Sequence, residues 1–439
     1  MAGGLMQLVA YGAQDVYLTG SPKVTFFQAV YKRHTNFAME TIEQVVNGTA
    51  ANNARLSVTV ARNGDLIGEM YLELVPTGTL VNTTNPSADV NDTIWVAERA
   101  VADIELTIGG QRIDKHYQKW WRLYSELYLD EAKKIQYGKM TSTTAATGDG
   151  KVFLPLVFFF NRNPGLYLPL IALQYHEVRL DITLAAAYGN YFTSAAVKVW
   201  GNYVYLDTEE RRRFAQKGHE YLIEQVQHTG VDTITAGGTK QVRLSYNHPV
   251  KELVWCFSNT GTASEYNDMW LTSHATTSNV VLTLEPLAQA NTATTTSTSI
   301  SSAGAPVQMA NVALANTSTT WVEDGAHAAK VSTGPLSTFK LILNGQDRFK
   351  EQSGKYFNQV QPFYHHSGNP YPGIYSYSFA LKPEEHQPTG TCNFSRIDNA
   401  QVEVVQKTNT ANTTNMHMFA VNYNVLRIQS GMGGLAFSN

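Results

Sequence analysis

Two histidine–glutamate pairs have the residue types of a zinc site. His176-Glu177 opens the stretch HEVRL, and His219-Glu220 opens HEYLI. The zinc-protease helix needs a second histidine four residues after the first, and the sequence has Leu180 and Ile223 at those places instead. We therefore expect both histidines to make structural hydrogen bonds, and we predict no metal site.

Other catalytic signatures are missing from the sequence. It has no G-x-S-x-G elbow, and neither Cys256 nor Cys392 has a flank that would activate a thiolate. The terminal SGMGGLAF lacks the Lys-Ser/Thr of a phosphate-binding loop, and His365-His366 lies in an aromatic, Gly/Pro-rich stretch that we expect to be a plain loop. The carboxylates are scattered, so a glycosidase pair can be neither built nor excluded at this point. The prediction is a protein that is not an enzyme, with no catalytic residue, metal or cofactor.

An aromatic stretch, GGQRIDKHYQKWW at Gly109–Trp121, could stack on sugars or bases. Beyond Asp114, which is a plausible N-cap, its large apolar residues are spaced three and four apart, as on one face of an amphipathic helix. Aromatic side chains at that spacing are mostly packing material, since each buries about 150 Å² or more. We therefore predict a strand that ends at Ile108, a glycine turn, and a helix that packs Trp120 and Trp121 on an apolar surface.

The composition excludes several classes of protein. Hydrophobic residues make up 43% of the 439 residues and aromatic residues 11%, enough to fill sizeable cores. Charged residues make up only 16% and the formal net charge is −3, so direct nucleic acid binding is not expected. The longest apolar run, VFLPLVFFF, is half the length that crosses a bilayer, and the N-terminus makes a poor signal peptide. We expect a soluble protein that folds in a reducing compartment with both cysteines reduced.

Short stretches that alternate between apolar and polar residues recur along the chain and predict β-strands. Turn residues separate them at the spacing of sandwiches or barrels, so the predicted fold is all-β. The predicted strands are LSVTVAR from Leu56, IELTI from Ile104, VRLDITL from Val178, VKVWGNYVYL from Val197, VRLSY from Val242, ELVWCF from Glu252, VVLTL from Val280, FKLIL from Phe339, IYSYSFAL from Ile374 and VEVV from Val402.

The phrase GGQ that follows IELTI returns as NGQ after FKLIL. Matching elements come in the same order in both halves, with a shift of 235 residues between Gln111 and Gln346 and of 224 between Val178 and Val402. This order predicts two copies of one β-fold. The densest charge cluster, DTEERRRFAQKGHE, falls between the halves and is expected to be a solvated connector, with a possible helical turn.

A series of blocks spanning nearly the whole chain carries a family resemblance. It begins with GGLMQLVAYGAQDVYLTGSPKVTFFQAVYKRHTNFAMETIEQ and continues through RNGDLI, IELTIGGQRIDKHY, LPLIALQYHEVRL, RFAQKGHEYLIEQ, LNGQDRF, YSFALKP, GTCNFSRIDNA and NYNVLRIQSGMGGLAF. This set strongly resembles the major capsid proteins of nucleocytoplasmic large DNA viruses, most closely those of algal viruses such as the chlorella viruses. The region from about Ser258 to Ser337 does not match well, and in that family it is the variable outer loop.

The resemblance implies an all-β double jelly roll: two tandem eight-stranded antiparallel β-sandwiches with short helices in the connecting loops. The implied domains are an N-terminal arm at 1–24, a first jelly roll at 25–208, a connector at 209–224 and a second jelly roll at 225–439. In the family, a homotrimer forms a pseudo-hexagonal capsomer, and capsomers tile an icosahedral shell over an internal membrane. The resemblance therefore implies a late structural protein of the virion that contacts neighbouring capsomers and minor capsid proteins and is assembled in the host cytoplasm.

Two further expectations concern the arm and a loop. The arm has few charges and several apolar residues, so we expect it to pack at the capsomer base against neighbours or minor capsid proteins. The charge-free segment Pro286–Val322 predicts a large surface loop. The resemblance implies glycosylation there, because algal-virus members carry glycans at asparagine in the context A/G-N-T-x-T, which ANTAT and ANTST match at Asn291 and Asn316.

Two other classes stay open on the residues alone. A sugar-binding β-sandwich lectin would need an exposed aromatic platform or a calcium-carboxylate cluster. A β-sandwich glycosidase would need two carboxylates about 5 to 9.5 Å apart in a cleft.

Overall fold

The computed structural model describes residues 3–76, 95–142, 151–192, 197–235, 237–259, 334–370, 373–407 and 413–437. The chain divides into two units, Met1–Phe37 and Ala38–Asn439. The first unit contains the helices α1 (Gly3–Val9) and α2 (Asp15–Thr19), in which no residue is buried. Its large apolar side chains face solvent, and Tyr17 and Phe27 are 93% and 98% exposed. This arm therefore has no hydrophobic core of its own.

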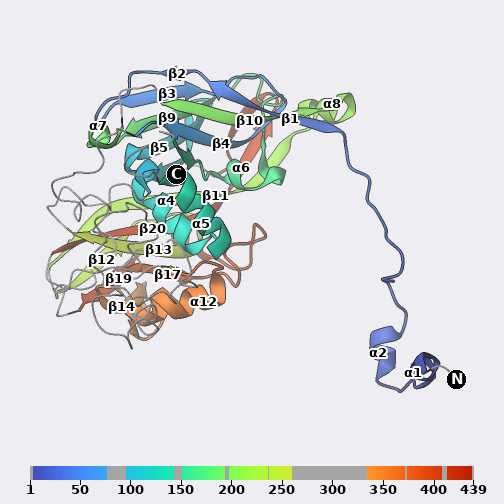
Figure 1. Ribbon diagram of the computed structural model, residues 1–439. Helices are drawn as coiled ribbons and strands as arrows, with labels where there is room; N and C mark the ends of the chain where they lie inside the picture. The colour runs from blue at the N-terminus through green and yellow to red at the C-terminus, as the bar shows by residue number, and fades with distance from the viewer. Residues whose placement is uncertain are drawn as a thin grey trace, which may run out of the picture. The chain divides into compact units, whose positions relative to one another are not determined.

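The second unit begins with a β-sandwich of two antiparallel sheets (Figure 1). One sheet has the order β1–β10–β4–β7, with β8 beside β4, and the other has the order β2–β3–β9–β5–β6. Neighbouring strands come from distant parts of the sequence, as in a jelly roll. The strands are β1 (Phe37–Gln44), β2 (Val46–Asn47), β3 (Arg55–Thr59), β4 (Leu66–Leu74), β5 (Val101–Ile108), β6 (Gln111–Tyr117), β7 (Val152–Pro155), β8 (Leu168–Pro169), β9 (Val178–Leu184) and β10 (Lys198–Leu206).

A second sandwich repeats this strand order. Its sheets run β11–β20–β13–β17, with β18 and β21 attached, and β12–β19–β14–β15, with β16 attached. Each of the eight principal strands therefore has a counterpart in the first sandwich, and the predicted all-β duplication is confirmed within the described residues. The strands are β11 (His219–Ile234), β12 (Thr239–Leu244), β13 (Pro249–Asn259), β14 (Leu336–Leu343), β15 (Gln346–Asp347), β16 (Gln352–Ser353), β17 (Ile374–Ser378), β18 (Cys392–Asn393), β19 (Ala400–Gln406), β20 (Thr414–Gln429) and β21 (Met432–Leu435).

The repeated phrase of the sequence is the same tight turn in both sandwiches. Gly109-Gly110 joins β5 to β6, and Asn344-Gly345 joins β14 to β15. All four residues have positive φ, with values of 58°, 81°, 50° and 80°. Two-residue hairpin turns of this kind require such angles, which glycine and asparagine adopt with the least strain. The echo in the sequence therefore reflects one backbone requirement met twice.

The strand register corrects one detail of the predicted repeat. Val178 of β9 pairs with Ile108, and Ala400 of β19 pairs with Leu343. The counterpart of Val178 is thus Ala400, and the sequence-based match to Val402 was wrong by two residues. Because side chains alternate with a period of two, that shift left the predicted buried face unchanged.

The alternating stretches are strands wherever the structure describes them: they form β3, β5, β9, β10, β12, β13, β14, β17 and β19. The stretch from Val280 lies outside the described residues. Alternation does not predict β4, β11 or β20. The middle of β20 is buried without interruption from Met418 to Asn424, because both sides of this strand are covered. A strand covered on both faces does not alternate in polarity.

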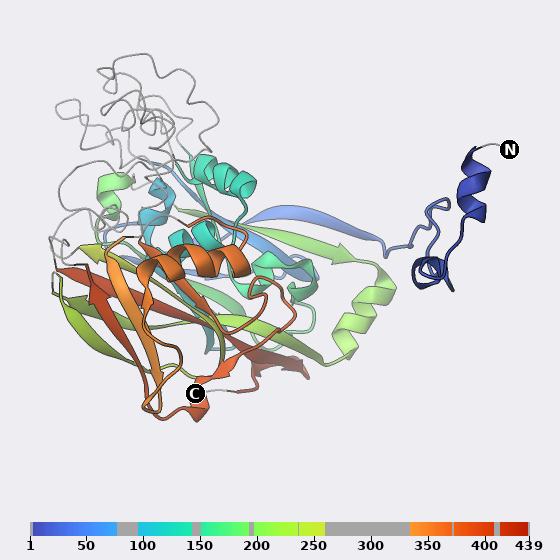
Figure 2. The same ribbon diagram turned by 90° about the horizontal axis from the view of Figure 1, so that it is seen from below.

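Short helices and helical turns connect the strands. They are η1 (Val96–Ala100), α4 (Gln118–Leu127), α5 (Glu131–Thr141), α6 (Phe159–Arg162), η2 (Pro164–Leu166), α7 (Tyr188–Tyr191), α8 (Thr208–Gln216), η5 (Tyr356–Val360, a π-helical turn), α12 (Gln361–His365) and η6 (Phe394–Arg396). Seen from below, α12 lies on the near side of the second sandwich (Figure 2). None of the helices in the described part of the chain is long and apolar enough to span a bilayer.

The charged segment between the halves contains α8, in which no residue is buried. Strand β11 begins at His219, inside the segment expected to connect the domains. The boundaries at residues 24, 208 and 224 stay predictions. Cys256 is buried, Cys392 is partly buried, and both are free.

Candidate functional site: the contact between the two sandwiches

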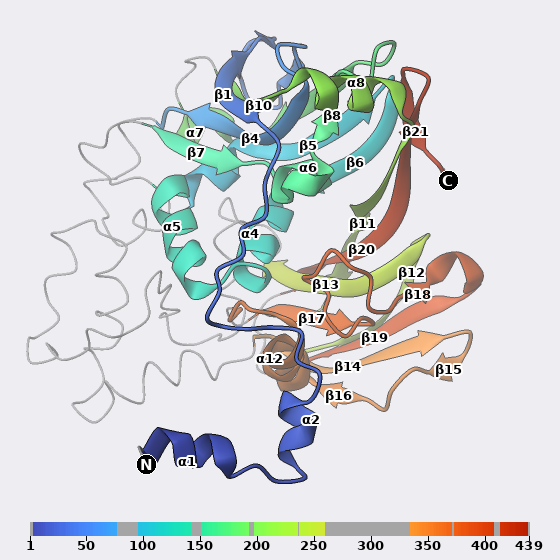
Figure 3. The ribbon, with the colours of Figure 1, turned by 90° about the vertical axis from the view of Figure 1, so that its right-hand side faces the viewer.

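Helix α4 lies between the two sandwiches (Figure 3). On one side, Nε1 of Trp121 donates a hydrogen bond to the carbonyl oxygen of Pro155 on β7, at 2.8 Å. On the other side, the ring of Trp120 lies 5.7 Å from that of Phe419 on β20. Trp120 and Trp121 are buried, with exposed fractions of 2% and 0%, so they cannot form the open platform that a lectin would need. The predicted packing role is confirmed, and the helix packs on two sandwiches.

The prediction that Asp114 caps this helix was wrong. Strand β6 continues through Asp114 to Tyr117, which is the N-cap residue and makes no capping bond with its side chain. The buried Asp114 carboxylate instead accepts a hydrogen bond from the backbone N–H of Val226 on β11, at 3.0 Å, and lies 3.0 Å from Nε2 of His116. Pairing of β6 with β5 extends the strand, and Asp114 joins the first sandwich to the second.

The sheet β11–β20–β13–β17 has an apolar surface on each side. Leu253, Trp255 and Met418 belong to the core of the second sandwich. Val254 and Phe419, which point to the opposite face, belong to the core that contains α4 and the first sandwich. Since both faces are buried, the two sandwiches share one continuous apolar contact.

Buried ions reinforce this contact. Oε1 of Glu224 on β11 lies 2.6 Å from Nζ of Lys251 on β13, and its Oε2 lies 3.0 Å from a guanidinium nitrogen of Arg162 in the first sandwich. Burial acts to raise the pKa of Glu224, but the two cations outweigh it and lower the pKa. Glu224 is therefore held as a carboxylate, and it links the two sandwiches electrostatically.

The stretch His365-His366 was expected to be a loop, but His365 is the last residue of α12, and only His366 lies beyond the helix. The side chain of His366 is fully buried, with Nε2 3.0 Å from Oε2 of Glu252 and Nδ1 3.4 Å from Oε1 of Glu384. Burial acts to lower the pKa of His366, but the two carboxylates outweigh it and raise the pKa to about 9. Its ring also packs edge-on against Tyr128, directly after α4, at 5.3 Å.

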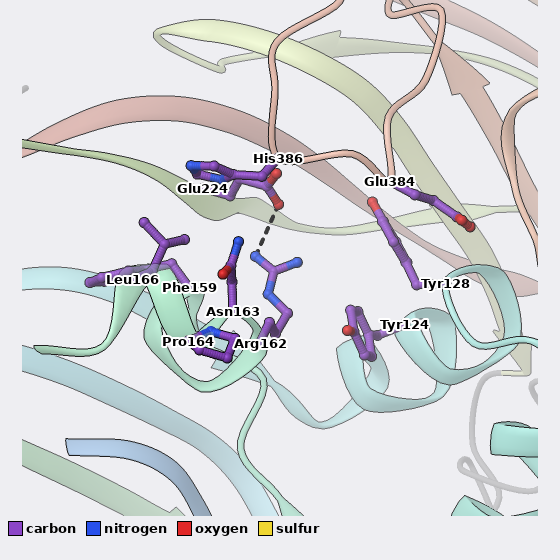
Figure 4. Close-up of a pocket in the computed structure, with 10 residues that line it drawn as sticks. All are labelled: Tyr124, Tyr128, Phe159, Arg162, Asn163, Pro164, Leu166, Glu224, Glu384 and His386. Atoms are coloured by element: carbon purple, nitrogen blue, oxygen red, sulfur yellow. Dashed lines mark hydrogen bonds and ion pairs between the residues drawn. The ribbon is translucent and has the colours of Figure 1, made fainter. Parts of the chain in front are cut away.

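A cavity of about 320 Å³ opens beside this contact (Figure 4). It contains two carboxylates, Glu224 and Glu384, which makes it the place to test the glycosidase interpretation. Burial acts to raise the pKa of Glu384, but the nearby His366 and the hydrogen bonds from Ser367 lower it, as the cations do for Glu224. A glycosidase needs one carboxyl group that keeps its proton near neutral pH. Neither carboxylate of this cavity has that property.

The histidine–glutamate pairs occupy structural positions. Nδ1 of His176 lies 2.9 Å from the carbonyl oxygen of Gly433, and Nε2 of His219 lies 2.8 Å from that of Phe214. The predicted hydrogen-bonding role of these histidines is confirmed. Among the residues that the structure describes, no three His, Cys, Asp or Glu side chains gather as metal ligands.

The candidate glycosylation residues, Asn291 and Asn316, lie outside the described residues. Sequence reasoning missed Arg162, Glu224, Lys251 and His366. The available signal was the adjacent charged pair Lys251-Glu252 inside an otherwise apolar strand, because buried charges need partners.

The matched strand orders and the shared buried contact define the class of protein: a double jelly roll whose two halves are joined by a packed helix. Two family models match the chain. One is described as "Major capsid protein N-terminus" and matches residues 25–207, and the other is described as "Large eukaryotic DNA virus major capsid protein" and matches residues 210–434.

Relatives and solved structures agree with these models. The chain is 43% identical to the major capsid protein of Paramecium bursaria Chlorella virus 1 and 41% identical to that of Pyramimonas orientalis virus, over 100% of each chain. It matches a chain of a quasi-atomic model of the PBCV-1 virus capsid with a TM-score of 0.71 at 37% identity, covering 94% of this chain and 100% of that one. The Faustovirus major capsid protein shares the fold, with a TM-score of 0.66 at 12% identity, over 97% of this chain and 96% of that one.

This chain belongs to the family of large eukaryotic DNA virus major capsid proteins. It is a structural capsid protein of a large DNA virus and not an enzyme.

Proposed function

We propose that three copies of this chain form a homotrimeric, pseudo-hexagonal capsomer, and that these capsomers tile an icosahedral shell. The observation that carries the proposal is the pairing of two sandwiches with one strand order across a buried contact. Three such pairs in a ring present six similar units, so a threefold object can pack with pseudo-sixfold neighbours. This packing gives the duplication a physical reason.

Sizing of the purified, full-length chain tests this proposal. Light scattering behind size-exclusion chromatography is expected to give a mass near three times 48.6 kDa that does not fall on dilution, because obligate interfaces are large. A monomer of 48.6 kDa would contradict the proposed capsomer.

The remaining parts of the proposal concern domains and partners. The proposed domains are an arm at 1–24, jelly rolls at 25–208 and 225–439 and a connector at 209–224. The family-model matches at 25–207 and 210–434 support the boundaries near residues 24 and 208. The capsomers would contact one another and minor capsid proteins in a shell over an internal membrane, with assembly in the host cytoplasm. The formal net charge of −3 supports a wall unit without direct contact to nucleic acid.

Glycans on Asn291 and Asn316 belong to the same proposal, supported by the matching sequence context at both positions. Intact-mass measurement of the virion protein is expected to exceed 48.6 kDa, and the excess should fall stepwise in Asn291→Gln and Asn316→Gln. Asn369→Gln, whose context is GNPYP, is the control. A virion protein whose mass equals that of the bare chain would exclude the glycans.

A further inference from the structure

The contact between the two sandwiches of one subunit has two partners, a helix and a sheet face. In the internal contact, α4 of the first sandwich covers the outer face of the β11–β20–β13–β17 sheet of the second (Figure 3). Each partner has a counterpart in the other sandwich. The sheet corresponds to β1–β10–β4–β7, and α4, which follows the β5–β6 hairpin, corresponds to η5 and α12, which follow the β14–β15 hairpin.

The two sheets can be matched residue by residue. Ile67 of β4 and Val250 of β13 hold the same place, since each pairs with the short extra strand, β8 or β18. Tyr71 and Val254 lie four residues further along and are therefore counterparts. Between these positions β4 has one extra residue in a bulge opposite β10, and β13 has one in a bulge opposite β20. Because the bulges match, the residue correspondence also holds for the neighbouring strands β10 and β20.

This match assigns a counterpart to the residue that α4 covers. Tyr71 pairs with Trp200 on β10, as Val254 pairs with Phe419 on β20. Trp200 therefore takes the place of Phe419, the residue that Trp120 packs against at 5.7 Å in the internal contact. An aromatic residue stands at the matching point of both sheets.

The two surfaces differ in whether they are covered. Val254 and Phe419 are 0% and 1% exposed, because α4 lies on them. Tyr71 and Trp200 are partly exposed on the first sandwich, and Phe153 extends this aromatic surface with its ring 5.8 Å from that of Tyr71. The outer face of the sheet β1–β10–β4–β7 thus has the residues of a contact surface, and Tyr71, Trp200 and Phe153 are left partly exposed there.

The counterpart of α4 is also open on its outer side. The segment is fixed to its own sandwich, because Gln361 accepts a hydrogen bond from the backbone N–H of Ser378 at 3.1 Å, and Nδ2 of Asn358 donates to the carbonyl oxygen of Ile374 at 2.8 Å. On its other side, Phe363 and Tyr364 are 80% and 72% exposed. A rigidly held helix with two adjacent exposed aromatic residues is typical of a protein interface.

We propose that η5 and α12 of one copy pack on the outer face of the β1–β10–β4–β7 sheet of the next copy, with Phe363 and Tyr364 against Tyr71 and Trp200. The contact is heterologous and repeats the internal one, so it joins the second sandwich of each copy to the first sandwich of the next. Three repeats close a ring of six sandwiches. This inference rests on the proposed homotrimer and assigns its seam.

Aspartate at the two exposed aromatic positions tests the helix side of the seam. Phe363→Asp with Tyr364→Asp should weaken trimer association on the order of a hundredfold or more, while the monomer keeps the far-ultraviolet circular dichroism of the wild type. Trp200→Asp should weaken association from the sheet side. Tyr175→Asp is the matched control, because Tyr175 is 75% exposed but belongs to neither surface, and it should remain a trimer.

Disulfide crosslinking tests the pairing itself. In a Cys392→Ser background, Phe363→Cys combined with Trp200→Cys should give covalent trimers on non-reducing gels after oxidation, whereas each single variant should run as a monomer. A self-complementary contact would stop at covalent dimers and overturn the assignment. The assignment would also be overturned if the wild type is a trimer, the paired cysteine variant does not crosslink and the aspartate variants still associate. A monomeric wild type would instead contradict the proposed homotrimer.

Discussion

His366 is a charged residue kept inside the protein by its partners. Its fully buried imidazole lies within 3.0 Å of Glu252 and 3.4 Å of Glu384, and its pKa is raised to about 9. The unfolded chain would hold this histidine near its ordinary pKa of about 6.5. The raised pKa therefore contributes stability that is fully present below about pH 6.5 and is lost as pH rises through about 9.

His366→Gln should lower the free energy of unfolding at pH 6 by about 3 kcal/mol, because it leaves the buried Glu252 without its cation. Urea unfolding of the wild type and the variant at several pH values measures this difference in the free energy of unfolding. The difference should shrink as pH rises through about 9. His365→Gln is the control, since that side chain makes one 3.0 Å contact with the carbonyl oxygen of Leu381. A difference that does not change with pH would contradict the assigned pKa.

At the scale of elements, the two hairpin turns require the same backbone conformation and achieve it with different residues. Both use a two-residue turn with positive φ, glycine with glycine in the first sandwich and asparagine with glycine in the second. Their surroundings differ, however. A Cβ at Gly109 would lie 2.2 Å from Nδ1 of His176, whereas one at Gly110 or Gly345 would meet no atom within 4 Å. The turns are therefore equivalent in conformation but not in packing.

Alanine substitutions separate these two effects. Gly110→Ala and Gly345→Ala should each cost about 1–2 kcal/mol of stability, from backbone strain alone. Gly109→Ala should cost at least about 1 kcal/mol more, because the His176 ring must move. Thermal or urea unfolding of the three variants measures the order. Unequal costs at Gly110 and Gly345 would argue against the equivalence of the two turns.

At the scale of the whole molecule, the chain consists of a two-sandwich body and an arm without a core. No residue of α1 or α2 is buried, although Leu8, Tyr17 and Leu18 are large and apolar. Exposed apolar residues in such number mark a segment that binds another surface. We therefore expect the arm to make contacts during shell assembly, and we expect the sandwiches to fold without it, since neither core contains an arm residue.

Deletion of residues 1–23 should leave the trimer and its thermal unfolding temperature unchanged, because the arm adds nothing to either core. Shell assembly should stop, since the arm's proposed neighbours would lose their contact. Size-exclusion chromatography measures the first outcome, and electron microscopy of particles from cells that supply only the truncated chain measures the second. Normal particles would show that the arm is dispensable.

The sequence predicted the parts of the fold that depend on neighbouring residues. Alternation revealed strands such as β5 and β14, whose faces differ in polarity, and the glycine turns revealed the duplication. Alternation failed for β20, because both of its faces are covered. Asp114 was misassigned for a related reason, since its partner Val226 lies 112 residues away, and a local cap was the nearest available interpretation.

By itself, the sequence determined the all-β class, the duplication, the family and the absence of any recognisable catalytic motif. Only the tertiary structure decided that α4 fills the contact between the sandwiches, that Glu224 and His366 are buried with partners, and that Trp200 stands where Phe419 is covered. The physical reason is the range of the interactions. Strands and turns follow from preferences of residues close in sequence, whereas a buried second face or a buried charge depends on residues that folding brings together from distant positions.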